Sequence, residues 1–385
     1  MKYILLIAIF LLSLLNHTPY VYIPAVFLLV FYMASLHDVT KISNGEMIAT
    51  LTYFLFILFS SIYFLTISID VSDASRNSFT NNLLFSFILF IIVFSIYRIC
   101  KSEKGMLDLK FSISFILILH VSIFMLQLVT VYVTGYYIDF VEPVTGEASR
   151  YINYILGGAL SGVLKYRATG LYVEPSTYAS AMTCVIASAV ALNVNRKIIN
   201  IAIITLLLNF STIGIILFFF VSISIYFNKI KLIHASIAAI AIIVMGIIYS
   251  DTLFYFIDDF IYKVENTSGS RFKLLDYIYF DTHGNLNLFG SGFFNIPSEL
   301  YAKITYGDYS VAALNDAGLF NFIYLKFGIL SIIPICYLFY KINRVSSKLL
   351  FACILISKIS FMFPVLYLAL IPSLMVKKQK KVGDL

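Results

Sequence analysis

The sequence predicts an all-α polytopic membrane protein with about twelve membrane-spanning helices, because apolar runs of sufficient length recur from end to end. Of the 385 residues, 61% are hydrophobic and only 12% are charged, whereas soluble domains contain about 25% charged residues. The runs are apolar on all sides and do not alternate with polar residues, as the strands of an outer-membrane barrel would. The composition therefore indicates a bundle of helices in a lipid bilayer.

The first five expected spans are apolar runs separated by short polar links. Lys2 precedes the first run, which lacks a small-residue cleavage site and is followed at once by Pro19 and a second run. We therefore expect a membrane span there and not a signal peptide. The next links are acidic at residues 70–76 and basic at residues 98–110. The five spans are expected at about residues 3–15, 20–36, 47–69, 83–97 and 111–134.

The other seven expected spans are separated by two long loops and by breaks within apolar runs. The loops cover residues 135–173 and 251–312, and the first contains a glycine-rich piece, residues 151–164, expected as a re-entrant or interfacial helix. The polar segment at 209–212 divides one apolar run, and Pro364 divides another. The seven spans are expected at about residues 175–192, 198–208, 213–227, 233–249, 313–340, 349–363 and 364–376.

The distribution of charge assigns these links to the two sides of the membrane. With both termini cytoplasmic, the cytoplasmic links contain most of the 27 Lys and Arg residues, and the external links contain most of the 20 Asp and Glu residues. This asymmetry is the one expected for a multi-pass membrane protein. Both long loops then lie on the external side. No internal repeat or linker is found, so residues 1–385 are expected to form one membrane domain.

The first external loop ends in a cluster of charged residues directly before an apolar run. Pro175 suits the first turn of a helix, so Glu174 is expected at the helix start, either as a cap or as a catalytic base. The helix dipole favours the anionic form of Glu174 there, which suits the cap better than the base. Arg167 offers a bidentate fork to phosphate, with Lys165 and Arg150 as supporting cations.

The second external loop contains further candidates for binding or catalysis. Arg271 is expected to contact phosphate or to pair with a loop carboxylate, and Asp316 to cap the next helix or to act as a second base. His283 is expected either as a solvated loop histidine or as a residue with a direct role. The candidates of this part of the chain, in order, are Arg271, His283, Gly290, Gly292, Asn315 and Asp316.

The order of these motifs resembles that in the O-antigen polymerases, integral membrane glycosyltransferases of bacterial surface polysaccharide synthesis. The resemblance covers about residues 150–376 and rests mainly on Arg167-x-x-Gly170-x-x-x-Glu174-Pro175-Ser176. The related O-antigen ligases typically have a catalytic histidine in the large external loop, near the span that follows. Asn315 and Asp316 stand near that place and His283 lies earlier, which favours a polymerase.

The resemblance implies a glycosyltransferase-C-like fold in the bacterial inner membrane. A glycan on undecaprenyl diphosphate would be transferred, at the periplasmic face, to the next lipid-linked repeat unit. Arg167 and Arg271 are expected to stabilise the leaving diphosphate, and Glu174 or Asp316 to act as the base. No cofactor or metal is expected, because the lipid already activates the donor. Substrate binding is expected to involve Lys165, Arg150, Gly170, Ser176, Gly290, Gly292, Asn315 and His283.

The implied partners are the undecaprenyl-diphosphate-linked oligosaccharide, membrane lipid, a chain-length regulator and a flippase, with no nucleic acid. An O-antigen ligase and a lipid-linked oligosaccharide flippase stay open as alternatives. Transporters usually contain paired repeats with interrupted spans, and none is found here. Lys326 and Lys358 lie within apolar runs, where a charge is costly and therefore suggests a function. For Lys326, snorkelling or pairing with a carboxylate is an equally good explanation.

Overall fold

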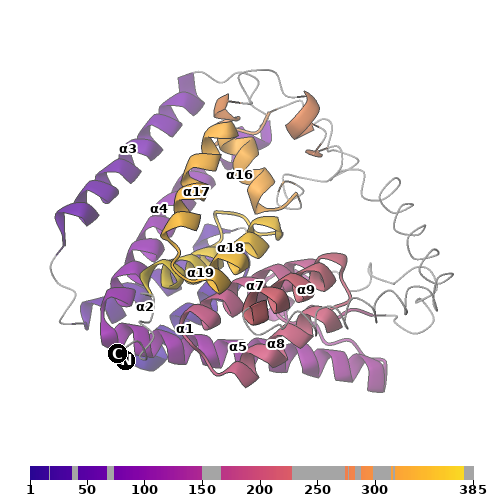
Figure 1. Cartoon of the computed structure of the whole chain (residues 1–385). Helices are drawn as coiled ribbons and strands as arrows, with labels where there is room; N and C mark the ends of the chain where they lie inside the picture. The colour runs from indigo at the N-terminus through magenta and orange to yellow at the C-terminus, as the bar shows by residue number, and fades with distance from the viewer. Residues whose placement is uncertain are drawn as a thin grey trace.

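The structure, a computed structural model, is described for residues 1–16, 18–36, 42–66, 73–149, 166–227, 274–275, 277–281, 288–297, 314 and 317–376. These segments are built of helices, which confirms the predicted all-helical class (Figure 1). Within them, four helical segments are long and apolar enough to cross a membrane: 44–66, 75–101, 103–134 and 319–341. The number of twelve spans is not confirmed.

The N-terminal half is a bundle built on two long helices, α4 and α5. Helix α1 packs against α2 and α5, and α2 packs against α4. Tyr32 of α2 donates its hydroxyl hydrogen to Asp108 of α5 at 2.6 Å, which fixes the two helices side by side. The elements are α1 (Lys2–Ser13), η1 (Pro19–Tyr22), α2 (Ile23–Ala34), α3 (Asn44–Thr66), α4 (Asp73–Lys101), α5 (Glu103–Thr134) and the short α6 (Glu142–Thr145).

Helix α3 stands apart along one side of the molecule (Figure 1). Only 11% of its most apolar window is buried, against 56% for α4. At its start, Glu46 forms ion pairs with Arg98 at 2.9 Å and with Lys101 at 2.7 Å. In its middle, Tyr53 donates to a backbone carbonyl of α4, and at its end Phe64 stacks on a phenylalanine of α4. A few side chains therefore hold α3, and most of its surface faces outward.

The C-terminal half is organised around α7 (Pro175–Ala191), which packs against α5, α8, α9, α18 and α19. Every residue from Tyr178 to Ala191 is buried. Alanine, serine and threonine dominate this helix, and small residues of this kind allow helices in membranes to approach closely. The other elements are α8 (Arg196–Leu208), α9 (Thr212–Tyr226), η5 (Tyr277–Asp281), α16 (Leu319–Phe327), η6 (Gly328–Ser331), α17 (Ile332–Lys341), α18 (Val345–Ile356) and α19 (Pro364–Met375).

Several of these helices are shorter than the predicted spans. The breaks expected at 209–212 and near Pro364 are present, but α8 has 13 residues and α18 and α19 have 12 each. A 12-residue helix is about 18 Å long, whereas the hydrocarbon core of a bilayer is about 30 Å thick. The span expected at 313–340 is also interrupted, because Gly328 has φ +61° and ends α16. The span expected at 233–249 lies outside the described residues.

Helices α7 and α18 are level at one end and not at the other. At the level end, the guanidinium of Arg344, which precedes α18, donates to the carbonyl of Ala191 and to the side chain of Asn193. At the other end, Lys358 donates its backbone N–H to the hydroxyl of Ser180 at 3.0 Å. Ser180 lies six residues after Glu174, so α18 ends about 9 Å short of the start of α7. The first one and a half turns of α7 therefore lie beside the link that follows α18 and not beside α18 itself.

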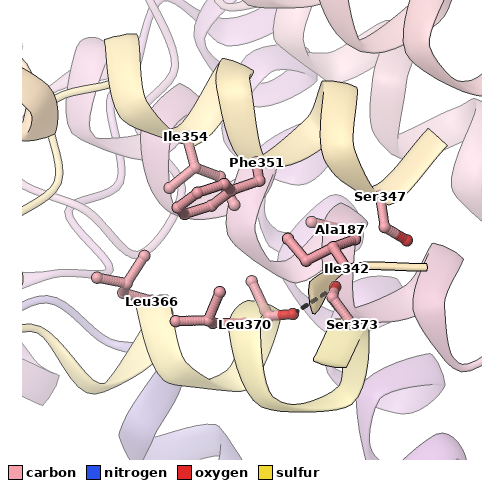
Figure 2. Close-up of a pocket in the computed structure, with 9 residues that line it drawn as sticks. Ala187, Ile342, Ser347, Phe351, Ile354, Leu366, Leu370 and Ser373 are labelled. Atoms are coloured by element: carbon pink, nitrogen blue, oxygen red, sulfur yellow. Dashed lines mark hydrogen bonds between the residues drawn. The ribbon is translucent and has the colours of Figure 1, made fainter. Parts of the chain in front are cut away.

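A small apolar cavity lies between α7, α18 and α19. Phe351 and Ile354 of α18 face Leu366 and Leu370 of α19 across it (Figure 2). Its volume is about 10 Å³, which has room for about one water molecule. The cavity is lined by no predicted site residue and is too small for a sugar or a lipid.

Candidate functional site

The segment before α7 is folded into a compact turn that buries its own backbone. Residues 168–172 are buried, and Arg167 and Glu174 on either side are half-buried. Gly170 has φ +60°, and a Cβ there would lie 3.2 Å from the ring of Tyr178. The glycine of the predicted motif is therefore required by a left-handed backbone packed against the first turn of α7.

Gln127 of α5 fixes this turn. Its side-chain oxygen accepts hydrogen bonds from the backbone N–H groups of Thr169 at 2.7 Å and Gly170 at 2.9 Å. Its amide donates to the carbonyl of Ile138 at 2.9 Å, which ties the loop after α5 to the same point. Gln127 is not among the site residues predicted from the sequence, although an amide within an apolar run was the available signal.

Replacing Gln127 with leucine is expected to destabilise the protein by about 2–4 kcal/mol, because two buried N–H groups lose their acceptor. Thermal unfolding of the purified protein in detergent measures the effect. Ser114→Ala is the matched control on α5, because the Ser114 hydroxyl bonds only to a carbonyl of its own helix. An unfolding temperature of Gln127→Leu equal to that of Ser114→Ala would contradict the proposed anchoring.

A buried polar network fixes the other side of the turn. The hydroxyl of Tyr172 donates to the carbonyl of Ser13 at 3.0 Å, and the Tyr172 ring stacks on His120. His120 Nε2 and the hydroxyl of Ser13 are 2.9 Å apart. Burial raises the pKa of Tyr172 well above 10.0, so its hydroxyl stays protonated as a donor. Helices α1 and α5 thus hold the turn in one position.

The loop that precedes the turn is closed by Asp139. The carboxylate of Asp139 accepts backbone N–H bonds from Ser149 at 2.7 Å, Val141 at 2.8 Å and Glu142 at 3.2 Å. Partial burial raises the pKa of Asp139, but these hydrogen bonds outweigh the burial and lower the pKa overall. The carboxylate of Asp139 therefore holds the loop closed and is not a candidate base.

Glu174 is the N-cap residue of α7, as the helix start predicted by Pro175 requires. Its backbone N–H donates to the hydroxyl of Thr177 at 3.1 Å, and its Oε2 accepts from the hydroxyl of Ser176, also at 3.1 Å. The capping alternative is thus realised in the structure. The catalytic alternative depends on what else faces the carboxylate.

Lys358 is one group that faces this carboxylate. It lies in the link between α18 and α19, and its Nζ is 4.0 Å from Oε2 of Glu174. The two side chains are only 11% and 15% exposed. The sequence predicted that Lys358 lies within a membrane span. In the structure it lies in an unwound link and faces a carboxylate. We call Arg167, Glu174, Ser176 and Lys358 the α7 N-terminal site.

Asn209 connects this site to the break between α8 and α9. Its amide donates to the carbonyl of Pro175 at 2.7 Å and faces the carbonyl of Ala168 at 3.4 Å. Ser211 caps α9 by accepting from the N–H of Gly214, where a Cβ would lie 2.7 Å from the Ser211 hydroxyl. The polar break predicted from sequence thus supports the start of α7.

The second glycine motif packs against the broken end of α16. Ser291 donates its N–H to the carbonyl of Leu325, and Gly292 donates to the carbonyl of Lys326, both at 2.9 Å. A Cβ on Gly290 would lie 2.4 Å from the carbonyl carbon of Lys326. Ser291 and Gly292 therefore satisfy carbonyls that the break at Gly328 leaves open, and Gly290 allows the close approach. The predicted role of Gly290 and Gly292 in substrate binding stays a prediction.

Neither snorkelling nor pairing with a carboxylate describes Lys326 in the structure. The residue is only 4% exposed, and its ammonium donates to the carbonyl of Asn295 and lies over the ring of Phe322. Among the described residues it forms no ion pair with a carboxylate, and its side chain does not reach the surface. A buried lysine in an interrupted membrane helix is costly, so it suggests a function.

Six of the predicted site residues lie outside the described residues: Arg150, Lys165, Arg271, His283, Asn315 and Asp316. Within the part of the chain that is described, no group of three residues is suited to hold a metal ion. The α7 N-terminal site brings together an ammonium, a carboxylate and a hydroxyl from two separate segments, and Arg167 lies seven residues before Glu174 in the chain. Such a set is suited to bind an anion and to exchange protons.

No protein-family model, curated protein or solved structure matches the chain. The resemblance to the O-antigen polymerases, which rests on the order of the motifs, therefore stays a prediction. The function has to be argued from the site itself.

Proposed function

We propose that the chain is a polysaccharide polymerase that joins undecaprenyl-diphosphate-linked repeat units at the external face of the bacterial inner membrane. The α7 N-terminal site carries this proposal. It consists of Arg167 and Glu174, next to backbone that Gln127 and Asn209 hold, and of Lys358, which faces Glu174 from the link between α18 and α19. A rigid support of this kind is what a catalytic site requires.

The proposed reaction is a displacement at an anomeric carbon. The acceptor hydroxyl forms the new C–O bond, the bond to the diphosphate oxygen breaks, and the electron pair leaves with the diphosphate. The hydroxyl proton passes to a base, for which Glu174 and Asp316 are the candidates from the sequence. Negative charge grows on the diphosphate, and cations fixed in a site of low dielectric constant stabilise it.

A transporter of lipid-linked oligosaccharides is the second candidate, and Lys326 favours it. Interrupted membrane helices with buried charges form the substrate and ion sites of many transporters. Helix α16 ends at Gly328 next to Lys326, whose side chain is buried. The paired repeat that usually accompanies such sites is not found in the sequence, so we place this function second.

Deleting the gene and separating the surface glycans by size tests the proposal. A polymerase deletion is expected to reduce the ladder of chain lengths to a single repeat unit on lipid A core. Long lipid-linked chains that never reach lipid A core would indicate a ligase. Absence of all glycan beyond the membrane, with single lipid-linked units retained in the cell, would indicate a flippase. Either of the last two results would overturn the polymerase proposal.

A further inference from the structure

We propose that the protein thins the lipid bilayer around α8 and α9, so that its partner on this side is a hydrocarbon layer no more than about 25 Å thick. The proposal rests on the distance between two polar layers of the structure. It concerns the surrounding lipid and not the substrate, and it therefore goes beyond the function proposed above.

The first polar layer lies at the start of α7. Glu174 caps this helix, and Lys358 faces its carboxylate. The break between α8 and α9 lies at the same level, because the amide of Asn209 donates to the carbonyl of Pro175 at 2.7 Å. A charge in the centre of a bilayer is costly, so we expect this layer at one membrane surface.

The second polar layer lies at the opposite end of α7. The guanidinium of Arg344 donates to the carbonyl of Ala191, the last residue of this helix, at 3.2 Å. Arg196 begins α8 and is exposed. The side chain of Asn200, also in α8, accepts from the hydroxyl of Tyr226, the last residue of α9. Helix α9 therefore returns to this layer, which we expect at the other membrane surface.

The helices between the two layers determine how far apart the layers lie. Helix α7 has 17 residues, α9 has 15 and α8 has 13. Their axial lengths are therefore about 25, 22 and 20 Å. The hydrocarbon core of a typical bilayer is about 30 Å thick, so it exceeds these lengths by about 5–10 Å.

The outward faces of α8 and α9 are apolar between the two layers, so acyl chains are the partner that suits them. The exposed apolar residues of these faces are Ile201, Ile204, Phe219, Phe220 and Ile223. A bilayer of full thickness around them would immerse one of the polar layers in hydrocarbon. Local thinning keeps both layers at the water interface.

Other responses to such a mismatch do not replace thinning here. Snorkelling requires a long, flexible side chain such as that of Arg196. The carboxylate of Glu174 is instead held at the cap of α7, where it accepts from the hydroxyl of Ser176. Tilting the helices would bring the two layers closer together along the bilayer normal and would enlarge the mismatch.

Tryptophan fluorescence measures the depth of α9, because the chain contains no tryptophan of its own. Thr212→Trp, Phe219→Trp and Phe227→Trp each place one probe at an exposed position, at the start, in the middle and just after the end of this helix. The purified variants are reconstituted in phosphatidylcholine vesicles with bromine at a shallow or a deep position of the acyl chain. Shallow bromine is expected to quench the two terminal probes more strongly, and deep bromine the middle probe.

Two other patterns of quenching would overturn the proposal. If the probe of Thr212→Trp lies deepest, α8 and α9 form a re-entrant hairpin whose break lies inside the bilayer. If all three probes lie at one depth, α9 lies along the membrane surface. An unfolding temperature in detergent equal to that of the unmodified protein shows that each variant is folded.

The preferred thickness of the bilayer is measured without any substitution. The protein is reconstituted in phosphatidylcholines whose mono-unsaturated chains have fourteen, eighteen or twenty-two carbons, and its thermal unfolding is followed. We expect the highest unfolding temperature with fourteen carbons and a value lower by about 5 °C or more with twenty-two. A maximum at eighteen or twenty-two carbons, or no change between the lipids, would contradict thinning. No glycan is involved, so the result is independent of the test for a polymerase.

Discussion

Cells that produce Arg167→Ala are expected to lose long-chain polysaccharide and to keep single repeat units at their surface. Arg167 directly precedes the segment that Gln127 and Asn209 hold against the start of α7, and it is the cation closest in sequence to Glu174. Removing one group that stabilises charge in a transition state typically lowers the rate by 10²–10³-fold. The length distribution of the surface glycan, separated by electrophoresis, measures the effect.

Two further variants separate charge from geometry at Arg167. Arg167→Lys keeps the positive charge but loses the bidentate fork, so only short chains are expected. Lys197→Ala removes an exposed cation at the far end of α7 and is expected to leave chain length unchanged. Full-length chains from Arg167→Ala, at normal amounts of protein in the membrane, would show that Arg167 is not part of the site.

Gly290→Ala is expected to disrupt the packing of residues 288–297 against α16. The free energy of unfolding is expected to fall by at least about 3 kcal/mol. A Cβ on Gly290 would lie 2.4 Å from the carbonyl carbon and 2.5 Å from the carbonyl oxygen of Lys326. These are backbone atoms, so a side-chain rotation cannot remove the clash. We expect a lower unfolding temperature in detergent and less protein in the membrane.

Two other glycines separate backbone strain from the clash. Gly135→Ala shares a positive φ of +72° but has nothing within 4 Å, so a cost of about 1–2 kcal/mol is expected. Gly45→Ala has neither constraint and is expected to be neutral or slightly stabilising. If Gly290→Ala unfolds at the same temperature as Gly135→Ala, the loop is not packed on α16 as described.

Local chemistry made parts of this structure predictable. Pro175 and Glu174 predicted the start of α7, Asn209 to Thr212 predicted a break, and Pro364 predicted the start of α19; all three are confirmed. Each rests on a property of one or two residues: a missing N–H, a side chain that caps a helix, or a fixed φ. The all-helical class followed equally directly from the composition.

Features that depend on distant partners could not be predicted in this way. Gln127 looked like one polar residue in an apolar run, and its role appears only with the turn at Thr169 beside it. The sequence showed Lys358 as a charge within an apolar run, but it did not show that Glu174 faces it. The shortness of α18 has the same origin, since the helix ends where Ser180 and Leu319 bind the backbone of the following link.

The loose attachment of α3 has a consequence for the way this protein moves. When a helix leaves a bundle in lipid, its apolar contacts with protein are exchanged for equivalent contacts with acyl chains, so little hydrophobic free energy is lost. Separation of α3 is therefore opposed mainly by the ion pairs of Glu46, the hydrogen bond of Tyr53 and the aromatic contacts of α3 with its neighbours. We expect α3 to be the first cooperative unit to exchange its amide hydrogens. The helix that we expect to separate most easily from the bundle would thus move laterally into the bilayer.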